Sequence, residues 1–190
     1  MLKKLIGARL DAMGKQLDYD ISYVREIMDI DLSALLALSK LSALSNYRRD
    51  VPVAVWHAAR LAGAMDADCG PCSQLMVTMA ERDHVAPELL RAVAAADDAA
   101  LSAEVLLGVH FTRAVLGHSA EADVLRDEIV QRWGRRALLS LAFGIVATRI
   151  YSTLKYALGY GRTCTRLQVG GKPLAVSRAG ASPDFAMAKA

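Results

Sequence analysis

Two cysteines separated by two residues are the part of this chain best suited to chemistry. The stretch Cys69-Gly70-Pro71-Cys72 can cycle between a dithiol and a disulfide. Pro71 fits a helix only in its first turn, so the pattern predicts that Cys72 lies at a helix start. The unpaired N–H groups and helix dipole there favour a thiolate, whereas Asp66 and Asp68 disfavour a further negative charge. The sequence does not decide which of these opposing effects on the Cys72 thiolate is larger. The spacing of the two cysteines nevertheless indicates redox chemistry.

The composition predicts one globular domain that associates with copies of itself. The chain has 190 residues, of which 54% are hydrophobic and 6% aromatic, which favours helix packing and a subunit interface. We expect a single domain over residues 1–178, a flexible tail over 179–190 and a homo-oligomer. A net charge of +3, with no basic run longer than a pair, argues against nucleic acid as a partner.

Three cysteines, two of them in one CxxC, do not make the disulfide framework of a secreted protein. The apolar run near Met1 is too short for a signal peptide, so we expect a cytoplasmic protein with a transient disulfide and a spare thiol at Cys164. Residues 138–160 are apolar but contain Arg149 and Lys155. We expect a buried or interface helix there instead of a membrane span. If the two charged side chains are buried they need partners, and carboxylates at a subunit interface would be enough.

Apolar spacing and the positions of proline and glycine predict an all-α bundle. The expected helices are 2–17, 21–44 with a break near 29–31, 53–65, one from the CxxC to 80, 88–94, 102–116, 121–133 and 136–158. Residues 166–176 differ, because two short alternating runs flank Gly170-Gly171, which is typical of a β-hairpin. We expect this hairpin to form an extended arm that lies on a neighbouring subunit.

A helix before the CxxC, a helix opening at it and all-α packing after it give a chain that resembles the AhpD-like and carboxymuconolactone decarboxylase family. Redox members of that family carry Glu, eleven residues, Cys-x-x-Cys, three residues and His. Cys69 and Cys72 match its cysteines, while His57 and Met76 occupy its glutamate and histidine positions. The resemblance extends over roughly residues 50–160 by helix order and implies an AhpD-like helical bundle.

The resemblance also implies a thiol-disulfide oxidoreductase, or a weak alkyl hydroperoxide reductase-like activity, that needs no cofactor. Cys72 would attack a peroxide or small disulfide, and Cys69 would resolve the product to a disulfide. An unidentified thiol or protein reductant would then regenerate the dithiol.

His57 is the first candidate for handling protons at the thiols. On a continuous helix it would lie ~18 Å from Cys69, so the chain must reverse near residues 63–68 to bring the imidazole close. Its neighbours Val53 and Leu61 are apolar, so His57 is expected to face the core. The alternative to a proton-handling role is a core histidine that is hydrogen-bonded to a backbone carbonyl. His110 is a second candidate proton carrier, and Gln74 is either a site residue or a solvated one.

Two other functions stay open, and one is rejected. A structural zinc site could take the CxxC with His57 and His84, although no second CxxC is present. A non-catalytic helical oligomer or interaction module with vestigial thiols is favoured by the absent Glu and His. Thioredoxin also has the tetrapeptide CGPC, but its fold requires strands around the motif, where this chain has helical spacing.

Overall fold

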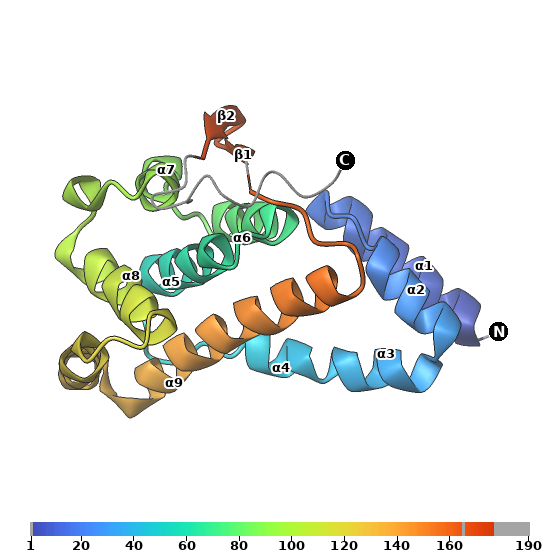
Figure 1. Cartoon of the computed structure of the whole chain (residues 1–190), viewed down its shortest axis with the longest axis horizontal. Coiled ribbons are helices and arrows are strands. Elements are labelled where there is room, and N and C mark those ends of the chain that lie inside the picture. The colour runs from blue at the N-terminus through green and yellow to red at the C-terminus, as the bar shows by residue number, and fades with distance from the viewer. Residues whose placement is uncertain (1, 165, 177–190) are drawn as a thin grey trace, which may run out of the picture.

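The computed structural model describes residues 2–164 and 166–176 and confirms the all-α fold with a short C-terminal extended segment (Figure 1). The predicted tail over 179–190 lies outside the described residues. The N-terminal helices are α1 (Leu2–Leu17), α2 (Ser22–Ile30), α3 (Leu32–Ser39) and α4 (Leu41–Ser45). The remaining helices are α5 (Val53–Asp66), α6 (Gly70–Arg82), α7 (Pro87–Ala95), the 3₁₀ turn η1 (Asp98–Ala100), α8 (Ala103–Leu116) and α9 (Glu121–Ala157).

The core is built around α5, which packs against α6, α7, α8 and α9. Leu61 and Ala64 of α5 are fully buried, as are Val77 and Leu141 on the surrounding helices. A smaller cluster formed by Tyr23, Val24, Met28 and Leu35 packs against Leu154 and Tyr160. The N-terminal helices are therefore anchored to the C-terminal part of α9, on one side of the main core.

The long helix α9 contains the break expected between residues 133 and 136, because Gly134 has φ 83° and ψ 173° inside it. By length and composition alone, α9 could cross a membrane, yet 44% of its most apolar stretch is buried within the fold. Arg149 on this helix pairs with Asp66 of the same chain at 2.9 Å. Arg149 is exposed, so the condition of burial under which a subunit-interface carboxylate was expected does not apply to it, and the end of α5 supplies the carboxylate.

The predicted hairpin is present as β1 (Arg166–Val169) paired antiparallel with β2 (Lys172–Ala175). It does not reach away from its own chain. Leu167 and Val169 are buried against the main core, and the Gln74 side chain of α6 accepts a bond from Gln168 N at 2.7 Å and donates one to Gln168 O at 3.0 Å. The arm predicted to lie on a neighbouring subunit therefore packs on α6 and α7 of its own chain, because those helices offer an apolar surface and a matching amide.

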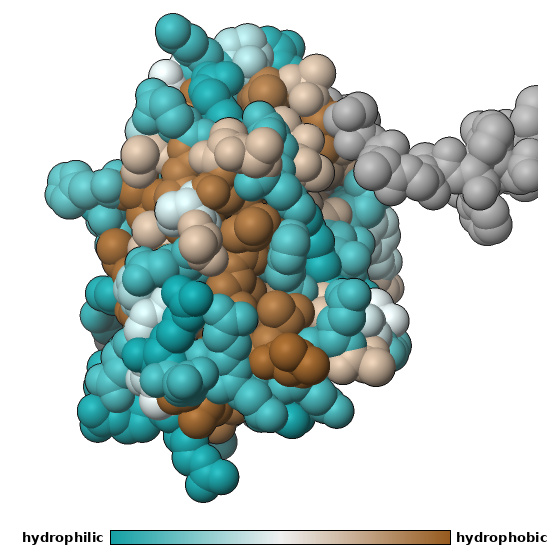
Figure 2. Space-filling view, turned by 90° about the vertical axis from the view of Figure 1, so that its left-hand side faces the viewer, coloured by the Kyte–Doolittle hydropathy of each residue, from teal (hydrophilic) through white to brown (hydrophobic). Residues whose placement is uncertain are grey.

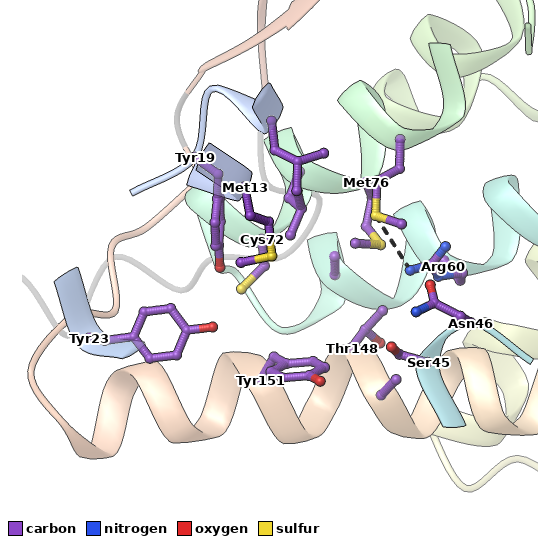
Figure 3. A pocket seen from close by; sticks show the side chains of 15 residues that line it. Met13, Tyr19, Tyr23, Ser45, Asn46, Arg60, Cys72, Met76, Thr148 and Tyr151 are labelled. Atoms are coloured by element: carbon purple, nitrogen blue, oxygen red, sulfur yellow. Dashed lines mark hydrogen bonds between the residues drawn. The ribbon is translucent and has the colours of Figure 1, made fainter. Parts of the chain in front are cut away.

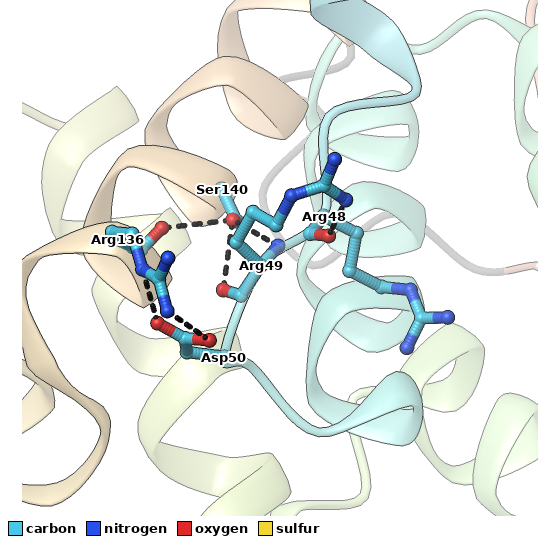
Figure 4. A network of polar contacts seen from close by, with 5 residues as sticks. All are labelled: Arg48, Arg49, Asp50, Arg136 and Ser140. Carbon is cyan, nitrogen blue, oxygen red and sulfur yellow. Dashed lines mark hydrogen bonds and ion pairs between the residues drawn. The ribbon is translucent and has the colours of Figure 1, made fainter.

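A polar network fastens the segment between α4 and α5 to α9 (Figure 4). Ser140 accepts a bond from Arg49 N at 2.8 Å and donates to Arg49 O at 3.1 Å. Next to it, Arg136 forms two hydrogen bonds with Asp50, at 2.6 and 3.0 Å. The network fixes where α5 begins relative to α9, and these two helices frame the site described below.

One face of the molecule, at the α7 and α8 end, carries a band of apolar side chains between hydrophilic ones (Figure 2). The band agrees with the apolar surplus of the composition. Self-association of the chain stays a prediction.

Candidate redox site

The two thiols of the CxxC lie side by side at the start of α6. Cys69 is the N-cap residue of that helix, Pro71 lies in its first turn and Cys72 follows it. The Sγ atoms of Cys69 and Cys72 are 2.6 Å apart, and both cysteines are free. The structure thus places Cys72 at the start of the helix, as the position of Pro71 predicted.

The turn that holds the thiols is fixed by the chain segment following α9. Gly70 N donates to Arg162 O at 2.8 Å, and Cys164 N donates to Asp68 Oδ1 at 3.0 Å. A Cβ at position 70 would lie 2.9 Å from Thr163 O, so the second residue of the motif must be glycine for this approach. The residues after α9 are therefore part of the site although they are remote in sequence.

The environment favours a single negative charge on the sulfur pair. Hydrogen bonds from the Cys72 thiol and the Cys72 backbone N–H lower the pKa of Cys69, against the opposing effect of burial. The bond to Cys69, together with burial, raises the pKa of Cys72. The pair therefore loses its first proton readily and retains its second. Because the two thiols are hydrogen-bonded to each other, the first pKa describes the pair and not one sulfur alone.

Lys155 of α9 supplies a positive charge next to the pair. Its side chain is 2% exposed, and its Nζ lies 4.2 Å from the ring centre of Tyr19 and 4.9 Å from that of Tyr23. Burial lowers the pKa of Lys155, while the charges of Cys72 and Cys69 raise it. The same attraction adds to the lowering of the Cys69 pKa and partly opposes the rise of the Cys72 pKa. For a buried Lys155, a carboxylate at a subunit interface was expected to be a sufficient partner. Within its own chain, its Nζ lies over two aromatic rings and is attracted by the charge of the thiol pair.

A cavity of about 230 Å³ opens against Cys72 (Figure 3). Its wall is mostly apolar and comes from α1, α2, α4, α5, α6 and α9, with Met13, Leu75, Met76, Met79 and Ala147 among the lining residues. Cys72 lines this cavity and Cys69 does not. Figure 3 shows Cys72 and Tyr19 toward one end and Arg60 and Asn46 toward the other, with Tyr151 between them. A small molecule in the cavity would therefore meet the sulfur of Cys72.

The structure does not bring His57 to the thiols. The chain reverses between α5 and α6 as predicted, and His57 is buried at 1% exposure. Antiparallel packing, however, places its Nε2 2.8 Å from Asp83 Oδ2, at the far end of α6. Asp83 follows Cys72 by eleven residues, which corresponds to about 16 Å along a helix. His57 is therefore not positioned for direct proton transfer with either sulfur.

The other candidate residues have structural contacts. His110 of α8 is hydrogen-bonded to Asp98 of η1 at 2.8 Å. The side chain of Gln74 forms the two hydrogen bonds to Gln168 of the hairpin described above. Cys164 is buried, and burial raises the pKa of its thiol. Within residues 2–164 and 166–176, no three His, Cys, Asp or Glu side chains are grouped so that they could hold a metal ion.

Sequence reasoning did not assign Tyr19, Tyr23 or Arg60 to the site. Arg60 carried a usable signal, because it is a charged residue one turn after Trp56 on a helix whose other faces are apolar. The tyrosines carried none, since they precede the CxxC by about fifty residues and reach it only through the packing of α2 against α9.

No family model, curated protein or solved structure matches this chain.

Proposed function

We propose that the protein is a dithiol oxidoreductase of the AhpD-like kind, in which Cys69 and Cys72 reduce a small disulfide or an organic hydroperoxide. The observation that carries the proposal is the pair of free sulfurs 2.6 Å apart at the end of an apolar cavity. Lys155 and the start of α6 both favour a thiolate on this pair.

Cys72 is the attacking sulfur in this proposal, because it lines the cavity while Cys69 lies behind it, fully buried. The pKa directions place the resting thiolate on Cys69 and the remaining proton on Cys72. In the proposed step this proton passes to Cys69 across the 2.6 Å between the sulfurs as Cys72 attacks. The short distance between the sulfurs lets Cys69 then resolve the intermediate on Cys72 without a rearrangement of the backbone.

With a hydroperoxide, the Cys72 thiolate attacks the O–O bond, which gives a sulfenic acid on Cys72 and releases an alcohol. Cys69 then attacks that sulfur, an S–S bond forms, and water leaves. The thiolate–thiol pair loses two electrons and its one proton, a second proton comes from solvent, and the hydroperoxide is reduced to alcohol and water. With a disulfide substrate, Cys72 forms a mixed disulfide and frees one thiol, and Cys69 displaces the second. An external thiol or protein dithiol reduces the Cys69–Cys72 bond again.

Mass spectrometry of the intact protein tests the proposal. We expect a stoichiometric amount of tert-butyl hydroperoxide to remove two hydrogens from the wild-type chain through a Cys69–Cys72 disulfide, found by peptide mapping. We expect Cys72→Ser to lose this disulfide and to consume hydroperoxide at least about tenfold more slowly, because the sulfur facing the cavity is gone.

Cys164→Ser is the matched control, since Cys164 is a buried thiol outside the pair. We expect it to form the disulfide as the wild type does. A wild-type chain that forms no Cys69–Cys72 bond, or a Cys72→Ser chain that turns over hydroperoxide unchanged, would show that the thiols are vestigial and favour the non-catalytic helical module.

The proposed cycle requires surroundings in which the dithiol is kept reduced, which is why we keep the cytoplasm as the proposed location. Regeneration is expected from a thiol partner of this compartment. No cofactor takes part in the proposed steps.

A further inference from the structure

Within residues 2–164 and 166–176, Arg60 is a buried cation without a matching anion. Its side chain is 3% exposed, and its Nε and Nη1 atoms have no hydrogen-bond partner in this part of the chain. The guanidinium carbon lies 4.1 Å from the centre of the Trp56 ring, and Nη2 donates only a 3.8 Å contact to Met79 Sδ. Among the described residues no carboxylate forms an ion pair with it, since the nearby Asp83 bonds to His57 instead.

Burial of an unpaired guanidinium works against the folded state. Burial lowers the pKa of Arg60 to about 10, so the group is still charged at neutral pH. An apolar side chain of similar volume would fill the same space at lower cost. The arginine is therefore better explained by a ligand than by the stability of the fold.

Arg60 lines the same cavity as Cys72, and the two residues lie toward opposite ends of it (Figure 3). Ser45, Asn46 and Thr148 line the cavity near Arg60 and add hydroxyl and amide groups there. The two ends of the cavity are linked through α5. Arg60 precedes Ala64 by one helical turn, about 6 Å, and the carbonyl oxygen of Ala64 accepts a hydrogen bond from Cys69 N at 3.5 Å. A molecule of modest length could thus touch both the guanidinium and the thiol end.

The cavity restricts the size and polarity of that molecule. Its volume of about 230 Å³ lies below the roughly 300–1,000 Å³ of sites for drug-sized ligands. Methionine, leucine and tyrosine side chains form the wall between the two ends. A small ligand with an apolar body and one planar anionic group matches this arrangement, because a guanidinium fork pairs best with a carboxylate.

We infer that the cavity binds small apolar carboxylic acids, with the carboxylate on Arg60 and the apolar body extending toward Cys72. We further infer that the substrates are disulfides or hydroperoxides of such acids. This second part of the inference rests on the proposed function. The binding itself requires no redox step.

Octanoate is the binding probe, and octanol is the uncharged control. Trp56 reports binding because Arg60 packs on its ring, and Trp133→Phe removes the background emission of Trp133. We expect titrations of Trp56 fluorescence to give octanoate binding about 10- to 100-fold tighter than octanol, the range of a charge-assisted hydrogen bond. We expect Arg60→Leu to remove this preference.

Arg48→Leu is the matched control, since Arg48 also lies over Trp56, at 6.0 Å, but does not line the cavity. It should keep the wild-type preference. If Arg60→Leu does not fold by circular dichroism, Arg60→Lys takes its place and should bind octanoate more weakly while still preferring it to octanol. Equal binding of octanoate and octanol to the wild type, or equal losses in the two Leu variants, would overturn the inference.

The same titration in Cys69→Ser/Cys72→Ser separates this inference from the proposed function. Retained octanoate binding there supports the carboxylate site even if hydroperoxide leaves the wild-type thiols unchanged. For substrate class, we expect 3-(methyldithio)propanoate, a disulfide with a single carboxylate, to oxidise the wild-type thiols faster than its methyl ester and Arg60→Leu to abolish the difference. Equal rates for acid and ester in the wild type would contradict the assignment of the substrate class.

Discussion

Lys155 brings a positive charge into a space beside the thiols that is almost free of solvent. It is 2% exposed, and its charge adds to the lowering of the Cys69 pKa and opposes the rise of the Cys72 pKa. We expect Lys155→Met to raise the pKa of the thiol pair, because the thiolate loses the favourable charge of Lys155. The measurement is the pH dependence of iodoacetamide alkylation of Cys69 and Cys72, whose midpoint should move to higher pH.

The control for this experiment is Lys172→Met on the hairpin, where the side chain is exposed. Its alkylation profile should match that of the wild type. An unchanged midpoint in Lys155→Met would mean that Lys155 is neutral in the folded protein and plays no part in thiol activation.

At the scale of elements, α5 and α8 approach each other closely at Gly108. A Cβ at this position would lie 2.6 Å from Val55 Cγ1, and a β-branched valine in a helix has little freedom to rotate away. We expect Gly108→Ala to lower the free energy of unfolding by about 1–3 kcal/mol, as overpacked cores do. Urea denaturation followed by circular dichroism measures this loss.

Val55→Ala removes the atom that the new methyl group would meet, so the double variant Gly108→Ala/Val55→Ala should lose less stability than the two single changes summed. Strictly additive losses would show that the helices shift apart without a clash. In that case the close approach would not determine how α5 lies in the bundle.

At the scale of the whole molecule, the His57–Asp83 pair makes stability depend on pH. Burial lowers the pKa of His57 below its usual 6.5, and the bond from His57 lowers the pKa of Asp83. As the pH falls through about 6.5, the unfolded chain gains a proton that the folded chain does not bind, so the free energy of unfolding decreases. We expect urea midpoints to fall between about pH 7.5 and about pH 5.5 and to fall less steeply in His57→Gln.

Asp83→Asn is the comparison for this effect, because it keeps the buried imidazole of His57 and removes the carboxylate whose bond raises the pKa of His57. We expect that variant to depend on pH at least as steeply as the wild type. A His57→Gln chain with the full wild-type pH dependence would assign acid sensitivity to other groups.

The order of the helices, the α6 start at the CxxC, the break in α9 and the hairpin could all be predicted from the amino-acid sequence. Each depends on a signal within one or two turns of chain, such as Pro71, Gly134 or the Gly170-Gly171 pair. The proximity of Cys69 and Cys72 could be predicted as well, because three residues at a helix start bring two side chains together.

Only the tertiary structure decided what surrounds the sulfurs. His57 was expected beside them, but antiparallel packing of α5 on α6 pairs it with Asp83 instead. Lys155 and Tyr19 come to the site from elements far apart in the chain, and Arg60 shares the cavity of Cys72. Helical periodicity shows which face of a helix is apolar, but the sliding and rotation of one helix against another depend on interlocking side chains throughout the core.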